Sequence, residues 1–380
     1  MGTMGHMPLG GQTWMHLNWI RGFQRLGHDV WYIEDNTAWP YDPVQNTITD
    51  DGQYAVRHIS RCMERIGLGD RWAYRLEERS DRTWGLTSVE MRELFQTSDA
   101  LVNITGGIDL REEHLAARLR VYVQTDPVTC ELRLANGDEH TRVAFANHNQ
   151  LVTYGENYGA PDCGVPLNGL RYLTTRQPID LDLWPMAFDP RATFFTTIGN
   201  YRQSGGDVEY QGDVYYWSKH REWQKFLDLP RLLKQPLELA SEVNGEDRAT
   251  LESYGWRVVP SLKMSQDVFG AYPDYIRRSR AEFTVAKDQN VRLRSGWFSE
   301  RDATYLASGK PVVAQDTGFS KILPVGEGLF AIQTLDDAMA AIEDINRDYE
   351  RHCRSARDIA RHYFECQTIC ARFLDEIGLT

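Results

Sequence analysis

The stretch from Ala281 to Ser320 constrains the fold most, because strand and helix signals alternate in it over a short distance. Residues 281–286 form a short apolar run that is typical of a buried strand, and residues 299–308 have helical spacing. Gly309 ends that helix, and the run PVVA that begins at Pro311 indicates a second strand. Alternating strands and helices build parallel sheets, so the sequence predicts the α/β class.

Positively charged residues surround the start of the predicted helix. Arg292 and Arg294 precede it in a predicted loop that also holds Lys287, and Arg301 lies in its first turn. Ser299 is a natural N-cap. A helix N-terminus offers free N–H groups and a partial positive charge, and it lies here at the end of a strand, where open α/β sheets bind ligands. These residues predict a site for a phosphate-bearing ligand; the alternative is a solvated surface loop.

The segment LASGKPVVAQDTG, from Leu306 to Gly318, resembles the donor-binding unit of GT-B glycosyltransferases, in particular the bacterial group that includes the CgeB-like proteins. The resemblance implies two Rossmann-like domains that face each other across a cleft, with a last helix that crosses back to the first domain. It also implies a nucleotide-sugar donor. A glutamate that often binds the donor ribose in the family is Thr304 here, and Glu300 is the candidate to replace it.

The expected organisation is an N-terminal domain on the acceptor side (1–180), a C-terminal donor-binding domain (190–355) and a helical tail that returns across the junction (356–380). Residues 176–190, rich in turn signals, are the expected linker. A doubly wound domain places a strand before its first helix. Residues 1–4 are therefore expected to be the remainder of that strand, or the native chain begins earlier.

The resemblance implies which residues bind the donor. Gly199, in the loop after the first strand of the second domain, permits close approach of the diphosphate, and Arg202 and Lys219 match the family's phosphate-binding arginine and lysine. The full expected donor site consists of Gly199, Arg202, Lys219, Arg292, Arg294, Ser299, Glu300 and Arg301.

Three residues compete for the role of the base that takes a proton from the acceptor. His6 lies in the glycine-rich loop before the first helix, where many inverting relatives place a catalytic base. Asp126 follows a predicted strand, and His148 precedes another. Two of them also have a structural explanation: His6 as an ordinary loop histidine or an expression remnant, and Asp126 as a turn cap.

Composition excludes several classes of partner and site. The 380 residues carry a net charge of −12, which argues against nucleic acid, and no apolar run approaches the length of a membrane span. The six cysteines form no CxxC pair, and we find no DxD motif suited to a metal ion and no zinc-ligand spacing, so we expect free thiols, a cytoplasmic location, no metal and no cofactor.

The sequence thus predicts a metal-independent glycosyltransferase that uses a nucleotide-diphosphate sugar, with a small-molecule or glycan acceptor. A non-catalytic nucleotide-sugar-binding relative and a GT-B nucleotide-sugar epimerase are the alternatives. The donor base, the acceptor, the stereochemistry and the oligomeric state stay open.

Overall fold

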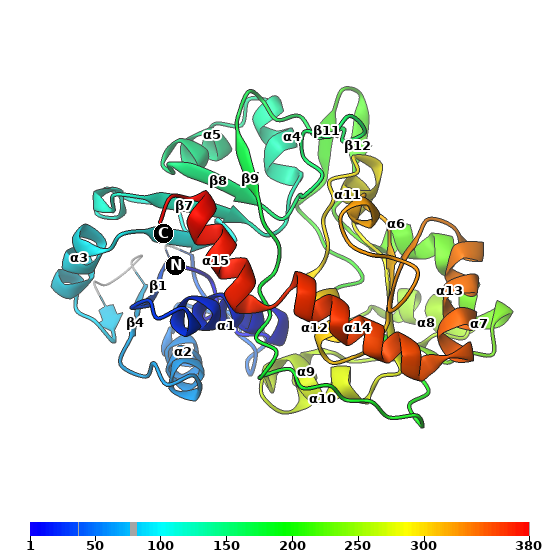
Figure 1. Ribbon diagram of the computed structural model, residues 1–380. Helices are drawn as coiled ribbons and strands as arrows, with labels where there is room; N and C mark the ends of the chain where they lie inside the picture. Colours follow the sequence, from blue (N-terminus) through cyan, green and yellow to red (C-terminus); the bar gives the residue numbers. More distant parts are fainter. Residues whose placement is uncertain (37, 77–81, 380) are drawn as a thin grey trace.

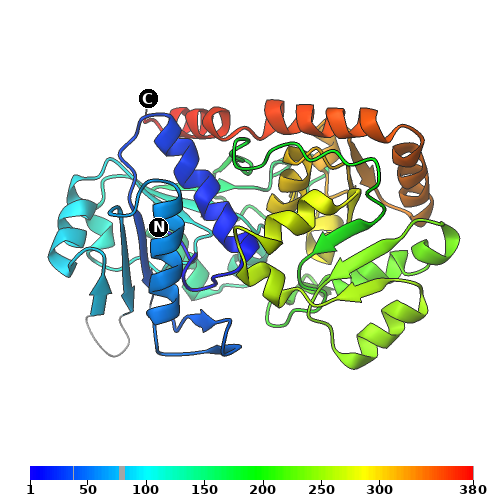
Figure 2. The ribbon, with the colours of Figure 1, turned by 90° about the horizontal axis from the view of Figure 1, so that it is seen from below.

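The structure is a computed structural model that describes residues 1–36, 38–76 and 82–379. Two groups of mainly parallel strands, each covered by helices, lie side by side and are linked by the segment around residues 176–190 (Figure 1). The chain ends in two successive helices that run from the second group back to the first, shown in red in Figure 2.

The first domain contains two sheets. One has the order β1-β4-β5 and the other the order β6-β7-β8-β9, with a separate small hairpin of β2 and β3. The strands are β1 (Tyr32–Asn36), β2 (Tyr41–Asp42), β3 (Thr47–Ile48), β4 (Trp72–Leu76), β5 (Arg82–Trp84), β6 (Leu101–Ile104), β7 (Arg120–Gln124), β8 (Gln150–Thr153) and β9 (Tyr172–Thr174). The helices are α1 (Gly10–Arg25), α2 (Gln53–Arg65), α3 (Ser88–Thr97), η1 (His114–Ala116), α4 (Thr129–Ala135) and α5 (Glu139–Ala146).

The second domain has one six-stranded parallel sheet with the order β14-β13-β10-β15-β16-β17, and a hairpin of β11 and β12. Its strands are β10 (Phe195–Ile198), β11 (Val208–Tyr210), β12 (Asp213–Tyr215), β13 (Leu237–Ala240), β14 (Arg257–Val259), β15 (Ala281–Thr284), β16 (Val312–Gln315) and β17 (Leu329–Ile332). Its helices are α6 (His220–Trp223), η2 (Gln224–Phe226), α7 (Leu229–Leu232), α8 (Gly245–Ser253), α9 (Leu262–Gln266), α10 (Ala271–Arg278), α11 (Asp288–Arg292), α12 (Glu300–Ala307), η3 (Phe319–Lys321), α13 (Leu335–Arg347), α14 (Tyr349–Tyr363) and α15 (Cys366–Glu376).

The strand–helix–strand unit predicted from the sequence is present as β15, α12 and β16, and the side chain of Ser299 caps α12 by accepting the N–H of Arg301 at 3.1 Å. The loop expected before this helix is partly wrong, because residues 288–292 form the short helix α11. Leu293 follows the last turn of α11, and its backbone carbonyl accepts the N–H of Gly164 from the first domain at 2.9 Å. A contact between domains therefore fixes a conformation that local sequence alone does not specify.

The C-terminal helices tie the domains together. α14 packs on α12 and α15 packs on α1, and the helical conformation breaks between α14 and α15 at Phe364. The carbonyl of Phe364 accepts the N–H of Ile179 at 2.7 Å, so the linker runs beside the break. Gly22 of α1 lets α15 approach closely, because a Cβ there would lie 2.3 Å from the sulfur of Cys370. The returning C-terminal helix is thus confirmed.

Candidate active site at the domain junction

The six-stranded sheet of the second domain has the doubly wound strand order. Numbered from β10 as the first strand, the order is 3-2-1-4-5-6. The chain adds β13 and β14 on one side of β10 and then β15, β16 and β17 on the other side, so the strand order reverses between β10 and β15. Ligands of open α/β sheets bind at the carboxyl ends of the strands at such a reversal. The loops that leave β10 and β15 begin at Gly199 and Val285, and both lie at this point of the sheet. The candidate site is built around it.

Lys219 is the central cation of the candidate site. Burial, and then the positive charges of Arg301 and Lys287, lower the pKa of Lys219 to about 7, while Asp302 acts in the opposite direction. Its Nζ lies 5.4 Å from the ring centroid of Trp297, and among the described residues it has no hydrogen-bond or ion-pair partner. A half-buried ammonium group beside two further cations is stabilised by an anion. Lys219 is therefore the residue that a bound phosphate would stabilise most.

Arg301 is held inside the second domain. Its guanidinium donates to Glu282, to the carbonyl of Ile198 at 3.1 Å and to Thr284 at 2.7 Å. Burial by itself lowers the pKa of Arg301, but the carboxylates of Glu282 and Asp302 outweigh it and the pKa rises. Arg301 is thus a fixed positive charge that joins β10, β15 and α12 at the reversal of strand order.

The glycine after β10 makes room for this arginine. A Cβ on Gly199 would lie 3.0 Å from Nη1 of Arg301, and the N–H of Gly199 donates to the carbonyl of Ala240 at 3.0 Å. The predicted residues Gly199, Lys219, Ser299 and Arg301 therefore do belong to one region of the structure. Their role in binding a donor stays a prediction.

An ion pair crosses the junction beside this region. Lys287, in the loop after β15, donates to Asp126, which follows β7 of the first domain. The ammonium of Lys287 also lies on the ring of Trp217, at 2.8 Å from its centroid. Burial lowers the pKa of Lys287, while Asp126 opposes that shift. The second oxygen of Asp126 is buried with no partner in the described part of the chain. Asp126 is thus the one candidate base that contacts the second domain directly.

The first domain contributes the N-terminus of α1 to the junction. Gly10 must be glycine, because a Cβ there would lie 2.4 Å from the ring of Tyr272 in α10. Leu9 precedes the helix and provides no side-chain cap, and the first turn has no acidic residue. The first N–H groups of this helix and its partial positive charge are therefore available at the junction. Figure 2 shows α1, in blue, reaching the yellow helices of the second domain.

Glu300 is a buried carboxyl group on the same face of the junction. Asn18 of α1 donates to one of its oxygens at 2.9 Å, and the other oxygen is buried without a partner among the described residues. Burial raises the pKa of Glu300 to about 8, against an opposing effect from the Asn18 hydrogen bond. Glu300 is therefore protonated at neutral pH and can donate a hydrogen bond through its second oxygen.

This protonation predicts how stability responds to pH. The unfolded chain releases the Glu300 proton near 4.5, whereas the folded protein retains it up to about 8. Between these values the folded state binds more protons, so the free energy of unfolding decreases as pH rises. Glu300→Gln removes this dependence, and we expect the stability advantage of the variant to grow from pH 5 to pH 8 and then stay constant. Urea unfolding at several pH values measures it; parallel curves for the two proteins would contradict the assignment.

Two other predicted arginines have partners within the second domain. Arg202 pairs with Asp247 of α8 and is half exposed. Arg292 donates to the carbonyl of Val214 at 2.8 Å and stacks on Tyr215, so it holds the β11–β12 hairpin. These contacts give both residues a structural role, and phosphate binding by them stays a prediction.

Arg294, by contrast, contacts the first domain. It donates to Asp162 at 2.7 Å and adopts a positive φ of 48°. Asn157 donates to the carbonyl of Arg294 at 2.8 Å, and the N–H of Asn157 donates to the carbonyl of Ser295 at 3.1 Å. Arg294 therefore holds the two domains together, and its predicted contact with a phosphate stays a prediction.

The two candidate histidines are neutral in their surroundings. Burial lowers the pKa of His6, with the carbonyl of Ala38 opposing the shift, and Nδ1 of His6 is buried without a partner in the described segments. His148 donates through Nδ1 to Ala144 at 2.7 Å, and its Nε2 lies 3.2 Å from the amide of Asn103. Both nitrogens of His148 are thus engaged within the first domain, whereas His6 retains one free nitrogen.

Glu34 shapes the loop that carries His6. Its carboxylate accepts the backbone N–H groups of Gly5 at 2.7 Å and His6 at 2.5 Å, together with the hydroxyl of Tyr32 at 2.7 Å. Carboxylates that accept several N–H donors hold a loop in one conformation. No sequence motif marked Glu34, since these partners come together only in the fold.

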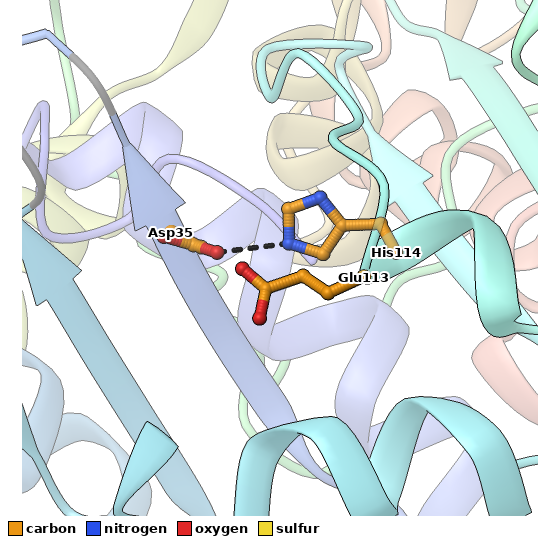
Figure 3. Close-up of side chains that lie close together, drawn as sticks. All are labelled: Asp35, Glu113 and His114. Carbon is orange, nitrogen blue, oxygen red and sulfur yellow. Dashed lines mark hydrogen bonds and ion pairs between the residues drawn. The ribbon is translucent and has the colours of Figure 1, made fainter. Parts of the chain in front are cut away.

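A buried charge network lies at the end of β1. Asp35, Glu113 and His114 each offer one ligand atom, all within 4.8 Å of one another, and Figure 3 shows His114 pointing at Asp35. Nε2 of His114 lies 2.8 Å from Asp35, and the guanidinium of Arg75 donates to both Asp35 and Glu113. Although burial raises the pKa of Asp35, its bonds with His114 and Arg75 hold it well below its usual range.

Arg111 also donates to Asp35. Guanidinium groups therefore already neutralise the carboxylates that a metal ion would use. We assign the network to the stability of the first domain rather than to metal binding. No sequence motif marks this network, because Asp35, Arg75 and His114 lie far apart along the chain.

No protein-family model matches the sequence, and no curated protein matches it either. Solved structures of glycosyltransferases are similar in fold. HepE from Anabaena in complex with UDP has a TM-score of 0.55 and 12% identity over 93% of this chain and all (100%) of HepE. AviGT4, a glycosyltransferase involved in Avilamycin A biosynthesis, has a TM-score of 0.51 and 13% identity over 97% of this chain and 89% of AviGT4.

Sucrose-phosphate synthase from Thermosynechococcus elongatus has a TM-score of 0.54 and 9% identity, over 96% of this chain and 91% of the synthase. At these identities the similarity concerns the fold, and the CgeB-like subgroup stays a prediction. Together with the strand orders and the returning C-terminal helix, these comparisons show that the chain has the GT-B fold of glycosyltransferases, with two Rossmann-like domains.

Proposed function

We propose that this protein transfers a sugar from a nucleotide-diphosphate donor to a hydroxyl group of an acceptor, without a metal ion. The observation that carries the proposal is the ammonium of Lys219 at the reversal of strand order, which has no hydrogen-bond or ion-pair partner in the described part of the chain and whose pKa is lowered to about 7 by burial and by neighbouring cations. In sugar transfer, negative charge develops on the departing diphosphate, and preorganised cations stabilise it.

The surrounding groups fit a diphosphate. The uncapped N-terminus of α1 faces the same junction from the first domain, next to Gly10 and Tyr272. Lys287 and Arg301 add positive charge, while their own carboxylate partners keep them in place. The fold also favours a nucleotide sugar, since HepE, which has the same fold, binds UDP.

A base from the first domain completes the proposed reaction. His6 retains a free ring nitrogen in a loop fixed by Glu34, and Asp126 has a buried oxygen without a described partner at the junction itself. Either group can accept the proton of the acceptor hydroxyl. We give neither priority, because the acceptor is not identified.

Binding of nucleotides tests the proposal first. No helix in the described part of the chain is long and apolar enough to cross a bilayer, and a cytoplasmic location, where nucleotide sugars are made, stays part of the proposal. We expect UDP or another nucleoside diphosphate to raise the melting temperature by mass action, with nucleoside monophosphates and inorganic phosphate weaker. Slow release of nucleoside diphosphate from the matching sugar donor then supports transfer.

The other outcomes distinguish the alternatives. Tight binding of a nucleotide sugar without release of the diphosphate would indicate a non-catalytic binding protein. A changed sugar still attached to the nucleotide would indicate an epimerase. If no nucleoside diphosphate or nucleotide sugar shifts the melting temperature at millimolar concentration, the proposed donor site is wrong.

A further inference from the structure

The β11–β12 hairpin (residues 208–215) belongs to the second domain but contacts α4 of the first domain. Its strands pair with each other in a two-stranded sheet apart from the six-stranded one. The carbonyl of Glu209 accepts the side-chain amide of Asn136 at 2.6 Å, and the carbonyl of Gly205 accepts the guanidinium of Arg133 at 3.0 Å. Figure 1 shows the hairpin beside α4, whereas the C-terminal helices pack on α12 and α1. The hairpin is therefore a further bridge between the domains.

A small apolar cluster lies between the hairpin and the first domain. It consists of buried residues from both domains: Val128, Leu132, Val165, Val208, Tyr215 and Leu293. Side chains alternate along a strand, so Val208 and its pairing partner Tyr215 point to the cluster, whereas Val214 lies on the other face. The exposed fractions agree, with 7% for Val208 and 39% for Val214. An isolated two-stranded hairpin is only marginally stable, so its position depends on contacts such as these.

The base of the hairpin leads directly into the candidate site. β12 ends at Tyr215, and the chain reaches Lys219 after three intervening residues. The N–H of Trp217, one of these three, donates to Asp207 at 2.8 Å across the base of the hairpin. The ammonium of Lys287 lies on the ring of the same tryptophan. A movement of the hairpin therefore displaces the segment that places Lys219 and the ring that contacts Lys287.

The first-domain side of the cluster contains a strained residue. Val128 has a φ of 91°, a conformation that β-branched residues rarely adopt. Its N–H donates to Glu131 at 2.9 Å, and its side chain is fully buried in the cluster. Strain of this kind persists only where neighbouring contacts maintain it. Since Val128 follows Asp126 by two residues, the packing of the hairpin helps to hold the loop that carries this candidate base.

From these contacts we propose that the β11–β12 hairpin is a latch between the domains. It binds α4 when the domains close and leaves α4 when they open, and it couples closure to the positions of Lys219 and Asp126. The contacts suit a reversible element, because the cluster is small and both hydrogen bonds come from the exposed side chains of Arg133 and Asn136. Segments that move in function have few buried contacts.

The latch also responds to the donor, and this part rests on the proposed function. A diphosphate that contacts Lys219 has more interactions in the closed state, where the hairpin places that lysine. Ligands shift a conformational equilibrium toward the state that they bind better. We therefore expect a bound nucleoside diphosphate to keep the hairpin on α4.

Two of the protein's own cysteines report on the latch. Cys163 is a free thiol that packs against the apolar cluster, so its alkylation is faster when the hairpin leaves α4. Cys62 of α2 is fully buried, so its alkylation reports unfolding of the first domain. N-ethylmaleimide labels both thiols, and mass spectrometry measures the rate for each of them in the protein without nucleotide.

Val208→Asp places a charge in the cluster, and a charge buried without a partner is unfavourable. We expect it to make alkylation of Cys163 about tenfold faster and to leave that of Cys62 unchanged. Val214→Asp introduces the same charge on the exposed face of the same hairpin, so it is the matched control and is expected to keep the wild-type rate.

A second variant opens the latch without disturbing the cluster. Arg133→Ala combined with Asn136→Ala removes both hydrogen bonds to the hairpin, and we expect it to make alkylation of Cys163 about threefold faster. Both replaced side chains are exposed, so the fold is retained. If Cys62 also reacts in Val208→Asp, that variant unfolds and the double alanine variant alone decides.

Two results would overturn the proposal. The first is a wild-type rate for Cys163 in the double alanine variant and in a folded Val208→Asp protein, which would show that the hairpin is no latch. The second is UDP, or whichever nucleoside diphosphate binds, leaving the rate for Cys163 unchanged in the wild type, since we expect it to slow alkylation. Absence of nucleotide binding would contradict the proposed function instead, and the rates without nucleotide would still decide whether the hairpin is a latch.

Discussion

Lys219→Ala is expected to weaken binding of the nucleoside diphosphate by about 10- to 150-fold, because a charge-assisted hydrogen bond contributes about 1.5–3 kcal/mol. The ammonium of Lys219 has no described hydrogen-bond or ion-pair partner in the free protein, so its removal leaves no buried group unsatisfied and stability changes little. Isothermal titration calorimetry with UDP, or with whichever diphosphate binds, measures the loss. Lys234→Ala, an exposed lysine of the same domain, is the matched control.

The pH dependence of the same binding step gives a second readout. In the free protein the pKa of Lys219 is about 7, so above that pH the side chain is increasingly neutral. A bound phosphate raises this pKa, and binding at pH 8 must therefore take up a proton. We expect affinity to fall between pH 7 and pH 9, and titrations in buffers of different ionisation enthalpy to show proton uptake that Lys219→Ala lacks. Equal proton uptake in the wild type and the variant would show that Lys219 does not contact the phosphates.

Arg301→Met is expected to cause the largest loss of stability, about 3–5 kcal/mol, because it leaves the carboxylate of Glu282 buried without its cation. Glu282 is fully buried, and its second oxygen already lacks a partner among the described residues. The substitution also removes the hydrogen bonds to the carbonyl of Ile198 and to Thr284. Urea unfolding at pH 7 measures the change in the free energy of unfolding.

A double variant separates this charge effect from lost packing. Glu282→Gln added to Arg301→Met removes the unpaired charge, and we expect it to restore a large part of the stability. A double variant as unstable as Arg301→Met alone would mean that the arginine acts through packing of its side chain. The pair is buried between α12 and β15, so a change of salt concentration should have little effect on this comparison.

Local sequence predicted the elements around α12 correctly because their signals are short-range. The apolar run of β15, the cap Ser299 and the terminating Gly309 act within a few residues of one another, and each is in its expected place. Residues that follow a parallel strand lie at the carboxyl edge of its sheet. Lys287 and Asp126 could therefore be placed near a binding edge from their positions in the sequence alone.

Side-chain partners could not be predicted in the same way. Arg292 and Arg294 have the residue type and position expected of phosphate ligands. In the fold, however, Arg292 donates to the β11–β12 hairpin and Arg294 donates to Asp162. These partners lie far along the chain, and an arginine forms an ion pair with whichever carboxylate the fold brings close. Thr304, where the family has glutamate, instead donates to the carbonyl of Glu300 at 2.8 Å within its own helix.

The sequence by itself determined the alternation of strands and helices and the placement of a lysine and glycines at strand ends, because these follow from periodicity, caps and turns. The GT-B plan came from the resemblance of the segment from Leu306 to Gly318 to the donor-binding unit of that family. Only the tertiary structure decided that Lys219 has no hydrogen-bond or ion-pair partner among the described residues, and that Arg292 and Arg294 pair with distant parts of the chain. Both depend on which distant segments meet, and the free energy of burying a charge or a backbone group is set by those neighbours rather than by the residue itself.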